Sequence, residues 1–239
     1  MALRSLYVEP EVTPETVDWP ALEFHDVFRI HRSGPVETVA LRGLDVRIER
    51  GEFVAVWGPS GSGKSTFLAL AGGLDRPTAG EVRAFGDPLS GLSEAELARY
   101  RAHTLAMVFQ SDNLWSALSA EENVRVALAL ADRDEARLRA RSALDAFGLA
   151  RRYAHPVHAL SGGEQQRVAI AAAAAREARL VLADEPTGEL DSFNERAVLD
   201  GFGRLRRDFG STVVVVSHSD VVARAADRVI EIRDGRAVR

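Results

Sequence analysis

Cysteine is absent from the 239 residues of the chain. Its absence excludes disulfide bonds, thiolate metal ligands and a cysteine nucleophile. It fits a reducing compartment, although secreted proteins can also lack cysteine. The composition therefore excludes thiol chemistry but leaves the compartment open.

Long apolar runs are also missing. No segment approaches the roughly 20 consecutive apolar residues that a membrane-spanning helix needs. The longest candidate, Val168 to Ala175, is short, rich in alanine and followed by Arg176. Acidic residues interrupt the N-terminus early, so it lacks a secretory pattern. We therefore expect a protein that is soluble by itself, with any membrane role supplied by a separate membrane chain.

Lysine is nearly absent, and the charge balance is mildly negative. The formal net charge is −5, which argues against nucleic acid as the main partner. Of the 30 basic residues, Lys64 is the single lysine and all the others are arginine. A compact ammonium on a flexible stem suits a phosphate loop better than a planar guanidinium does.

The segment around this lysine, from Gly58 to Thr66, matches the phosphate-loop pattern G-x-x-x-x-G-K-[ST] in full. It follows an apolar run, Phe53 to Trp57, which predicts a buried parallel strand, and it precedes a predicted helix from Thr66 to Ala71. A tight glycine-rich loop turns backbone N–H groups inward and forms an anion site with the helix N-terminus. A chance glycine-rich turn would not show the whole pattern in this setting. We therefore predict binding of ATP.

The predicted phosphate contacts come from one continuous loop. They are Gly58, Ser60, Gly61, Ser62, Gly63, Lys64, Ser65 and Thr66. Lys64 is expected to reach the β- and γ-phosphates, and Ser65 to hold Mg²⁺.

Two more apolar runs end in polar residues. Leu180 to Ala183 runs into Asp184 and Glu185, and Thr212 to Ser217 runs into His218. In open α/β sheets the ligand chemistry lies at the carboxyl ends of the strands. Asp184 is placed to hold Mg²⁺, and Glu185 to polarise an attacking water. Without other evidence, two acidic residues after a strand belong more often to a helix cap or a loop than to a catalytic site. The phosphate loop upstream makes the catalytic site the favoured interpretation here.

A second anion site is predicted at Ser161. The segment Leu160 to Arg167 precedes an alanine-rich helix, and Ser161 is followed by two glycines. Such a turn is usually only a helix cap. One nucleotide site needs one such loop, however, so the second suggests a composite site. In that site Ser161 and Gly163 of one subunit cover the ATP of another.

The organisation of the chain predicts an α/β fold. Short strands are expected between Leu22 and Val56, with a turn at Ser33-Gly34-Pro35. A helical region is expected from about 113 to 160, with a helix start close to a capping box at Ser119-Ala120-Glu121-Glu122. Residues 1–20 are rich in proline and acid and are expected to be an extended N-terminal arm, with a disordered or loosely docked tail as the alternative. The remaining residues, 21–239, are assigned to one ATPase domain with a helical subdomain at about 111–160.

Taken together, these segments resemble the ATPase subunit of ATP-binding cassette (ABC) transporters, over nearly the whole chain from about residue 21. The resemblance implies a P-loop NTPase (RecA-like) core with a parallel sheet, an N-terminal antiparallel β subdomain and an inserted α-helical subdomain. It implies hydrolysis of Mg-ATP by two copies that close head to tail. It also implies separate membrane permease subunits as partners, no nucleic acid, and a peripheral location on the cytoplasmic face of the inner membrane.

The resemblance also implies roles for single residues. Gln110 resembles the glutamine loop, which senses the γ-phosphate and meets the membrane subunit. Asp191 resembles the D-loop at the dimer seam, and His218 resembles the switch histidine. His31 stands where the family usually places an aromatic residue on adenine. The implied catalytic set is Glu185, His218 and Gln110, and the implied metal set is Ser65, Gln110 and Asp184.

Two further positions depart from the usual pattern of the family. Glu189 replaces the asparagine usual before Leu190 and adds a negative charge near the dimer seam. Ala172 replaces an arginine common in the helix after Ser161. Neither change removes a catalytic group, so hydrolysis is still predicted.

The sequences of two segments narrow the class of ABC protein. Gly72 to Glu81 and Ala183 to Gly188 are similar to a bacterial branch that serves lipoprotein release, macrolide and peptide export, and cell division. This favours an exporter-like or mechanotransmitting system over a solute importer. One alternative is a regulatory ATPase of the division-associated type, which controls an extracellular hydrolase through a membrane protein. Another is a soluble ABC protein of translation or repair, although the tandem cassettes or long inserts usual there are missing. The membrane chain largely determines the substrate in this family, so the substrate stays open.

Overall fold

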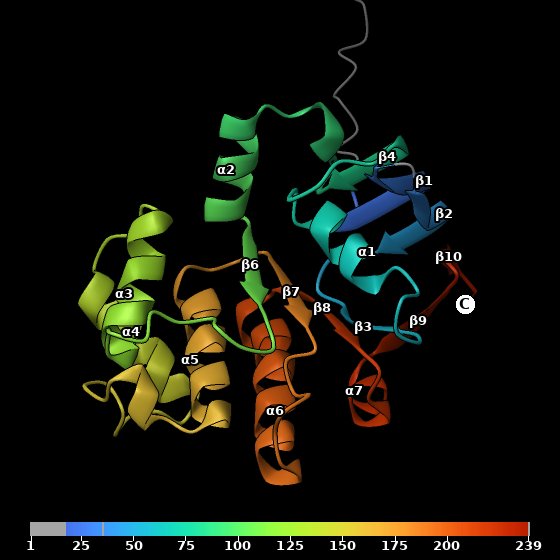
Figure 1. Cartoon of the computed structure of the whole chain (residues 1–239). Coiled ribbons are helices and arrows are strands. Elements are labelled where there is room, and N and C mark those ends of the chain that lie inside the picture. The colour runs from blue at the N-terminus through green and yellow to red at the C-terminus, as the bar shows by residue number, and fades with distance from the viewer. Residues whose placement is uncertain (1–17, 35, 239) are drawn as a thin grey trace, which may run out of the picture.

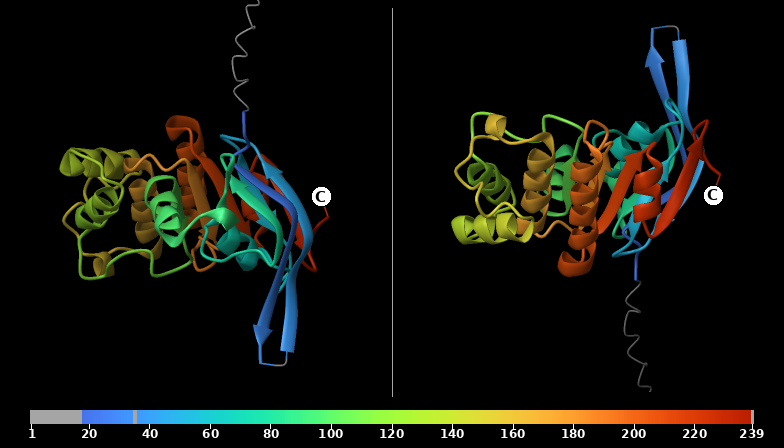
Figure 2. Two further views of the ribbon diagram at one scale, coloured as in Figure 1. Left: turned by 90° about the horizontal axis from the view of Figure 1, so that it is seen from above. Right: turned by 90° about the horizontal axis from the view of Figure 1, so that it is seen from below.

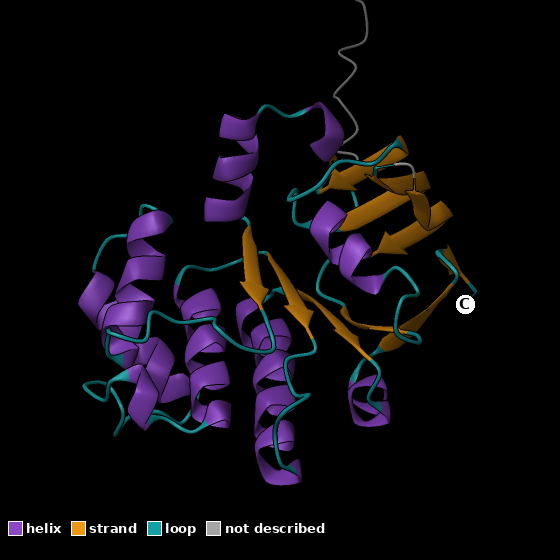
Figure 3. Ribbon diagram, viewed as in Figure 1, coloured by secondary structure: helices purple, strands orange, loops and turns teal. Residues whose placement is uncertain are grey.

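The computed structural model describes residues 18–34 and 36–238. The predicted N-terminal arm therefore lies outside the described residues except for 18–20, and so does Pro35 of the predicted turn. Two β-sheets and a group of helices make up the described part (Figures 1 and 3).

The larger sheet has six strands in the order β10-β9-β3-β8-β7-β6. Its neighbouring strands are parallel except for β10, which runs antiparallel to β9. The bounds are Phe53–Trp57 for β3, Leu105–Val108 for β6, Leu180–Asp184 for β7, Thr212–Ser217 for β8, Arg228–Arg233 for β9 and Arg236–Ala237 for β10.

The central strands are apolar on both faces because both faces are covered. Successive side chains of a strand point to opposite sides of the sheet. In β3, Val54 and Val56 belong to one hydrophobic core with α1 (Lys64–Ala71), whereas Phe53 and Ala55 belong to the other. That second core includes α5 (Gly162–Ala175) and α6 (Ser192–Phe209). The predicted burial of these runs is confirmed, and burial on both faces accounts for the lack of alternation.

The smaller sheet is antiparallel and has the order β2-β1-β4-β5. Its strands are Leu22–Ser33, Val36–Ile48, Ala79–Ala84 and Asp87–Pro88 for β1, β2, β4 and β5. Figure 2 shows the β1–β2 hairpin extending beyond the rest of the chain. The stacked rings of Phe24 and Phe67, 4.5 Å apart, join this sheet to α1.

The predicted division at Ser33–Gly34 is confirmed, but the two strands on either side of it, residues 22–33 and 36–48, are long and not short. Three register shifts interrupt the pairing of β1 with β2, and Asp26 has a positive φ of 46°. Such bulges break the alternation of side chains along a strand, so the sequence pattern resembles separate short segments.

The helical region predicted at about 113–160 contains two helices, α3 (Ala120–Leu130) and α4 (Ala136–Ala146), joined by loops and followed by the short 3-10 helix η2 (Val157–Ala159). Ser119 begins α3 with a complete capping box, as predicted, because its side chain and that of Glu122 each accept a backbone N–H. The elements not predicted from the sequence include the helices η1 (Leu89–Gly91), α2 (Glu94–His103), α6 and α7 (Asp220–Ala225) and the strands β4, β5, β6, β9 and β10. No helix of the described residues is long and apolar enough to cross a membrane.

The fold brings four loops to one edge of the large sheet. Parallel strands of matched register end together, so the loops that follow them are neighbours. The pairs near the ends are Trp57 with Ser217, Asp184 with Val216, and Val108 with Ala183. The loops after β3, β6, β7 and β8 carry most of the residues that the sequence singled out, whereas His31 lies on β1 and Ser161 and Gly163 lie at the start of α5.

Candidate active site

The loop from Gly58 to Gly63 joins β3 to α1, and its backbone leaves no space for side chains at two positions. A Cβ on Gly58 would lie 2.2 Å from the Ile232 carbonyl oxygen, and one on Gly63 would lie 2.6 Å from that of Ala40. Gly63 also has a φ of 107° and is the N-cap of α1. These contacts explain physically why glycine is required here. The helix begins at Lys64, two residues earlier than predicted.

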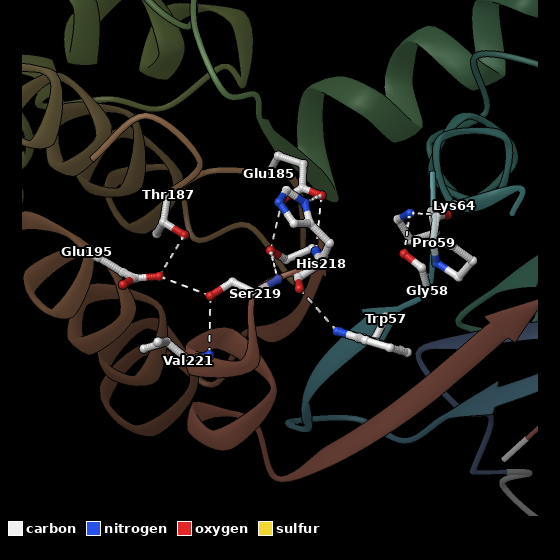
Figure 4. Close-up of polar contacts among 11 residues, drawn as sticks. Trp57, Gly58, Pro59, Lys64, Glu185, Thr187, Glu195, His218, Ser219 and Val221 are labelled. Carbon is white, nitrogen blue, oxygen red and sulfur yellow. Dashed lines mark hydrogen bonds and ion pairs between the residues drawn. The ribbon is translucent and has the colours of Figure 1, made fainter. Parts of the chain in front are cut away.

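The Lys64 ammonium is folded into this loop. Its Nζ donates to the carbonyl oxygens of Gly58 at 2.8 Å and Pro59 at 2.9 Å, and the residue is 9% exposed (Figure 4). The hydroxyl of Ser62 is buried as well and has no hydrogen-bond partner among the described residues. Burial of a cation that bonds only neutral carbonyls, and of a hydroxyl without a partner, costs folding free energy.

Asp184 ends β7 next to this loop. Burial and the charge of Glu185 raise the pKa of its carboxyl, while the Lys64 charge and the Ser65 hydroxyl lower it. Ser65 and Asp184, two of the three residues predicted to serve Mg²⁺, are therefore neighbours. A carboxylate beside a hydroxyl offers the hard oxygen ligands that Mg²⁺ prefers.

Glu185 and His218 form the most constrained pair of the site (Figure 4). Glu185 Oε1 lies 2.8 Å from His218 Nδ1 and accepts the His218 backbone N–H at 3.1 Å. Its Oε2 accepts the Ser217 hydroxyl at 2.8 Å. Glu185 has a φ of 44°, and its N–H donates to Val216 O at 2.9 Å. The carboxylate is thus held by the end of β8 on both of its oxygens.

Gln110 follows β6 and is exposed, but its side chain contacts neither Ser65 nor Asp184. Its Nε2 donates to Glu189 Oε1 at 3.2 Å. The third predicted metal residue is therefore turned towards the loop after β7 in this structure. Glu189 is also one of the residues that depart from the usual family pattern.

Ser161, Gly163 and Asp191 lie together at the starts of two helices. Ser161 caps α5 by accepting the Glu164 N–H at 3.2 Å. A Cβ on Gly163 would lie 2.4 Å from Asn194 Oδ1, and Asp191 caps α6 by accepting the Asn194 N–H at 2.9 Å. In the described residues, the hydrogen bonds of Ser161 and Asp191 stay at the starts of their own helices, and none reaches the phosphate loop. One copy of the chain therefore does not bring all predicted nucleotide contacts together.

His31 lies beside the helix that follows the phosphate loop. Its Nε2 is 3.5 Å from Thr66 Oγ1, and the imidazole is exposed on β1. This contact places the ring next to a predicted phosphate-loop residue, as a residue facing a bound nucleotide would be.

Comparison with known proteins identifies the family of the chain. A family model described as ABC transporter matches residues 41–188, which is more than half of the chain. The chain belongs to the ABC transporter family. ATP binding and hydrolysis are the activity of this family, and the chain has the α/β fold of its P-loop ATPases.

Relatives of two kinds match almost all of this ABC ATPase. The macrolide export ATP-binding/permease protein MacB of Azoarcus sp. (strain BH72) is 42% identical, over 96% of this chain but only 35% of its own length. The lipoprotein-releasing system ATP-binding protein LolD of Geobacter metallireducens is also 42% identical, over 91% of this chain and 97% of its own. The chain thus spans about a third of the exporter and nearly all of the releasing-system protein.

A solved structure of the ATP-binding cassette MJ0796 has the same fold. It is a dimer in a post-hydrolysis state, bound to ADP and Pi. It shares 39% sequence identity and a TM-score of 0.83 with this chain and covers 91% of it, or 97% of the solved chain.

Sequence reasoning missed Gln166, which is buried in α5. Its Nε2 donates to the backbone carbonyls of Phe109 at 2.9 Å and Gln110 at 2.8 Å, and its Oε1 accepts from Asn113 at 3.3 Å. No local signal distinguished it, because Glu164, Gln165 and Arg167 beside it in α5 are polar as well. This amide fixes the backbone of the glutamine loop of the ABC ATPase to the helix that begins at Ser161.

Proposed function

We propose that this ABC ATPase hydrolyses Mg-ATP as a head-to-tail dimer and drives export or extraction through a separate membrane permease. One observation carries the catalytic part of the proposal. Lys64, the Asp184–Glu185 pair and His218 follow three parallel strands that end at one edge of the sheet. Relatives named for macrolide export and lipoprotein release support the export class and do not favour the regulatory alternative.

The phosphate loop fits a nucleotide. The Lys64 ammonium bonds only carbonyl oxygens of its own loop, and the buried Ser62 hydroxyl lacks a partner. Phosphate oxygens would satisfy both groups. The backbone of Gly61, Gly63 and Lys64, with the start of α1, would hold the anion, together with the other predicted contacts Gly58, Ser60, Ser65 and Thr66. His31 would face the adenine.

The metal would be held by Ser65 and Asp184, with Gln110 joining after it leaves Glu189. Bound Mg²⁺ neutralises charge on the phosphates. Glu185 orients and activates the attacking water, and His218 contacts the γ-phosphate. The Ser217 hydroxyl and the His218 ring hold one carboxylate oxygen each, which fixes the direction in which Glu185 accepts a proton.

A second copy would complete the site. Ser161 is exposed at the N-terminus of α5, and Asp191 is exposed next to it at the start of α6. Ser161 and Gly163 of one copy would cover the ATP held by Lys64 of the other, with Asp191 at the seam between them. The dimer of MJ0796 bound to ADP and Pi supports pairing of such cassettes.

The membrane partner would dock beside the glutamine loop. A groove between that loop, α3 and α5 is lined by Trp115, Leu130 and Ala172, among others. Trp115 is 68% exposed and Leu130 65%, which is unusual for large apolar side chains. Docking there would place the ATPase on the cytoplasmic face of the membrane and would let Gln110 respond to the permease.

The test is ATP-driven dimerisation of Glu185→Gln, measured by light scattering in saturating Mg-ATP. Without its activating carboxylate, this variant should bind ATP and stay dimeric. Lys64→Ala is the matched control, since it should lose ATP turnover and stay monomeric with its fold largely intact. If Glu185→Gln stayed monomeric both with and without the membrane partner, the composite site would be wrong. Transport is tested separately, by asking which candidate substrates stimulate hydrolysis by the complex with the permease.

A further inference from the structure

Glu195, in the first part of α6, joins the two loops that carry the catalytic pair. Its Oε1 accepts the hydroxyl of Ser219 at 3.2 Å and lies 3.4 Å from that of Thr187 (Figure 4). Ser219 directly follows His218, and Thr187 follows Glu185 by two residues. Neither the phosphate loop nor the proposed metal site uses this carboxylate.

Hydrogen bonds on the side chain and on the backbone of Ser219 connect Glu195 to Glu185. The Ser219 hydroxyl donates to Glu195 and accepts the Val221 N–H at 3.2 Å. The Ser219 N–H donates to Ser217 Oγ at 3.1 Å, and the Ser217 hydroxyl donates to Glu185 Oε2 at 2.8 Å. The Ser219 hydroxyl gives its one proton to Glu195, so this contact holds the Ser219 side chain and, with it, the residue whose backbone N–H bonds Ser217.

A purely local role for Glu195 is the competing explanation. An acid near the N-terminus of a helix stabilises that helix through its dipole. Two observations favour the longer-range role. Thr187 is 5% exposed, so its hydroxyl needs an internal partner, and Oε1 of the carboxylate faces the hydroxyls of both loops (Figure 4).

We propose that Glu195 is a positioning residue for Glu185 and His218, acting through Ser219 and Ser217. Since α6 begins at the Asp191 cap, the same carboxylate links the catalytic pair to the proposed dimer seam. Closure of the dimer would thus change the position of Glu185 through α6. The inference rests on the proposed function of Glu185 and His218.

The test compares turnover by the full-length chain carrying Glu195→Ala, Glu195→Gln or Asp200→Ala. Loss of the acceptor should lower kcat about five-fold, the rate equivalent of one net hydrogen bond, and leave the KM for Mg-ATP unchanged. Glu195→Gln should keep most of the kcat, because its amide oxygen still accepts from both hydroxyls. Asp200, an exposed carboxylate further along α6, is the matched control and should have the wild-type kcat.

A double-mutant cycle with Ser217→Ala separates this path from a local helix effect. If Glu195 acts through Ser217, then Glu195→Ala should lower kcat no further in the Ser217→Ala background. The inference is overturned if Glu195→Ala has the same kcat as Asp200→Ala, or if Glu195→Gln loses as much kcat as Glu195→Ala. It is also overturned if Glu195→Ala lowers kcat by the same factor in the Ser217→Ala background. These outcomes are distinct from failure of the proposed dimer mechanism, which would show as a monomeric Glu185→Gln variant in ATP.

Discussion

The buried side-chain amide of Gln166 donates to the backbone carbonyl of Gln110 at 2.8 Å, across 56 positions of sequence. The same amide donates to the Phe109 carbonyl at 2.9 Å. One rigid group therefore fixes the glutamine loop to α5, whose N-terminus carries Ser161. Movement of that loop by a membrane partner would move the start of α5 with it.

Gln166→Leu should loosen this connection. The apolar side chain has a similar size but leaves two carbonyls without their donor in partly buried surroundings, which should cost roughly 1 kcal/mol of unfolding free energy. Denaturant unfolding measures that cost, and hydrogen exchange at residues 109–113 should become faster. Gln165→Leu is the control, because the Gln165 amide donates to Val157 and Leu160 instead, at 3.1 Å each. Equal exchange rates in the two variants would contradict the assigned role of Gln166.

Glu189 is expected to restrain Gln110 before ATP binds. The Gln110 amide donates to its carboxylate, and the negative charge also opposes an approaching nucleotide. Glu189→Ala should lower the KM for Mg-ATP about two- to five-fold, as loss of one hydrogen bond predicts.

Glu189→Gln separates the two causes, since it keeps an acceptor for Gln110 and removes the charge. A hydrogen-bonded restraint predicts a wild-type KM for Glu189→Gln, whereas a charge effect predicts the KM of Glu189→Ala and a dependence on salt. An unchanged KM in Glu189→Ala would show that neither operates.

Local patterns explain what the sequence could predict. The phosphate loop, the buried runs of β7 and β8 and the capping box at Ser119 each depend on neighbours within a few residues. Their strand, helix and loop assignments follow from period and residue type. The catalytic and binding roles of these residues are proposals.

The missed features depend on residues far apart in sequence. Gln166 has its partners 56 and 57 positions away, and Glu195 reaches Ser219 across 24. The strand β6 has only 4 residues and gives no periodic signal, although pairing with β7 makes it regular. The strand β1 is long, but its register shifts break the alternation of its side chains, so the sequence pattern does not reveal its length.

The cap at Asp191 predicts a pH-dependent stability of α6. Hydrogen bonds from Asn194 and the Phe193 N–H lower the pKa of its carboxyl below the usual 3.8. A group with a lowered pKa in the folded state stabilises the fold above its unfolded pKa and loses that contribution as pH falls through the folded value. The stabilising effect of Asp191 should therefore be complete at neutral pH and fade below about pH 3.8.

The measurement is the difference in unfolding free energy between the wild type and Asp191→Ala, from denaturant titrations at several pH values. This difference should be largest at neutral pH and should shrink in acid, because the protonated carboxyl is a weaker acceptor for the helix N–H groups. Ser192→Ala, one residue along the same helix turn, removes no ionisable group, so its difference from the wild type should not vary with pH. A difference for Asp191→Ala that stays constant from neutral pH into acid would show that the charge of this cap does not stabilise the start of α6.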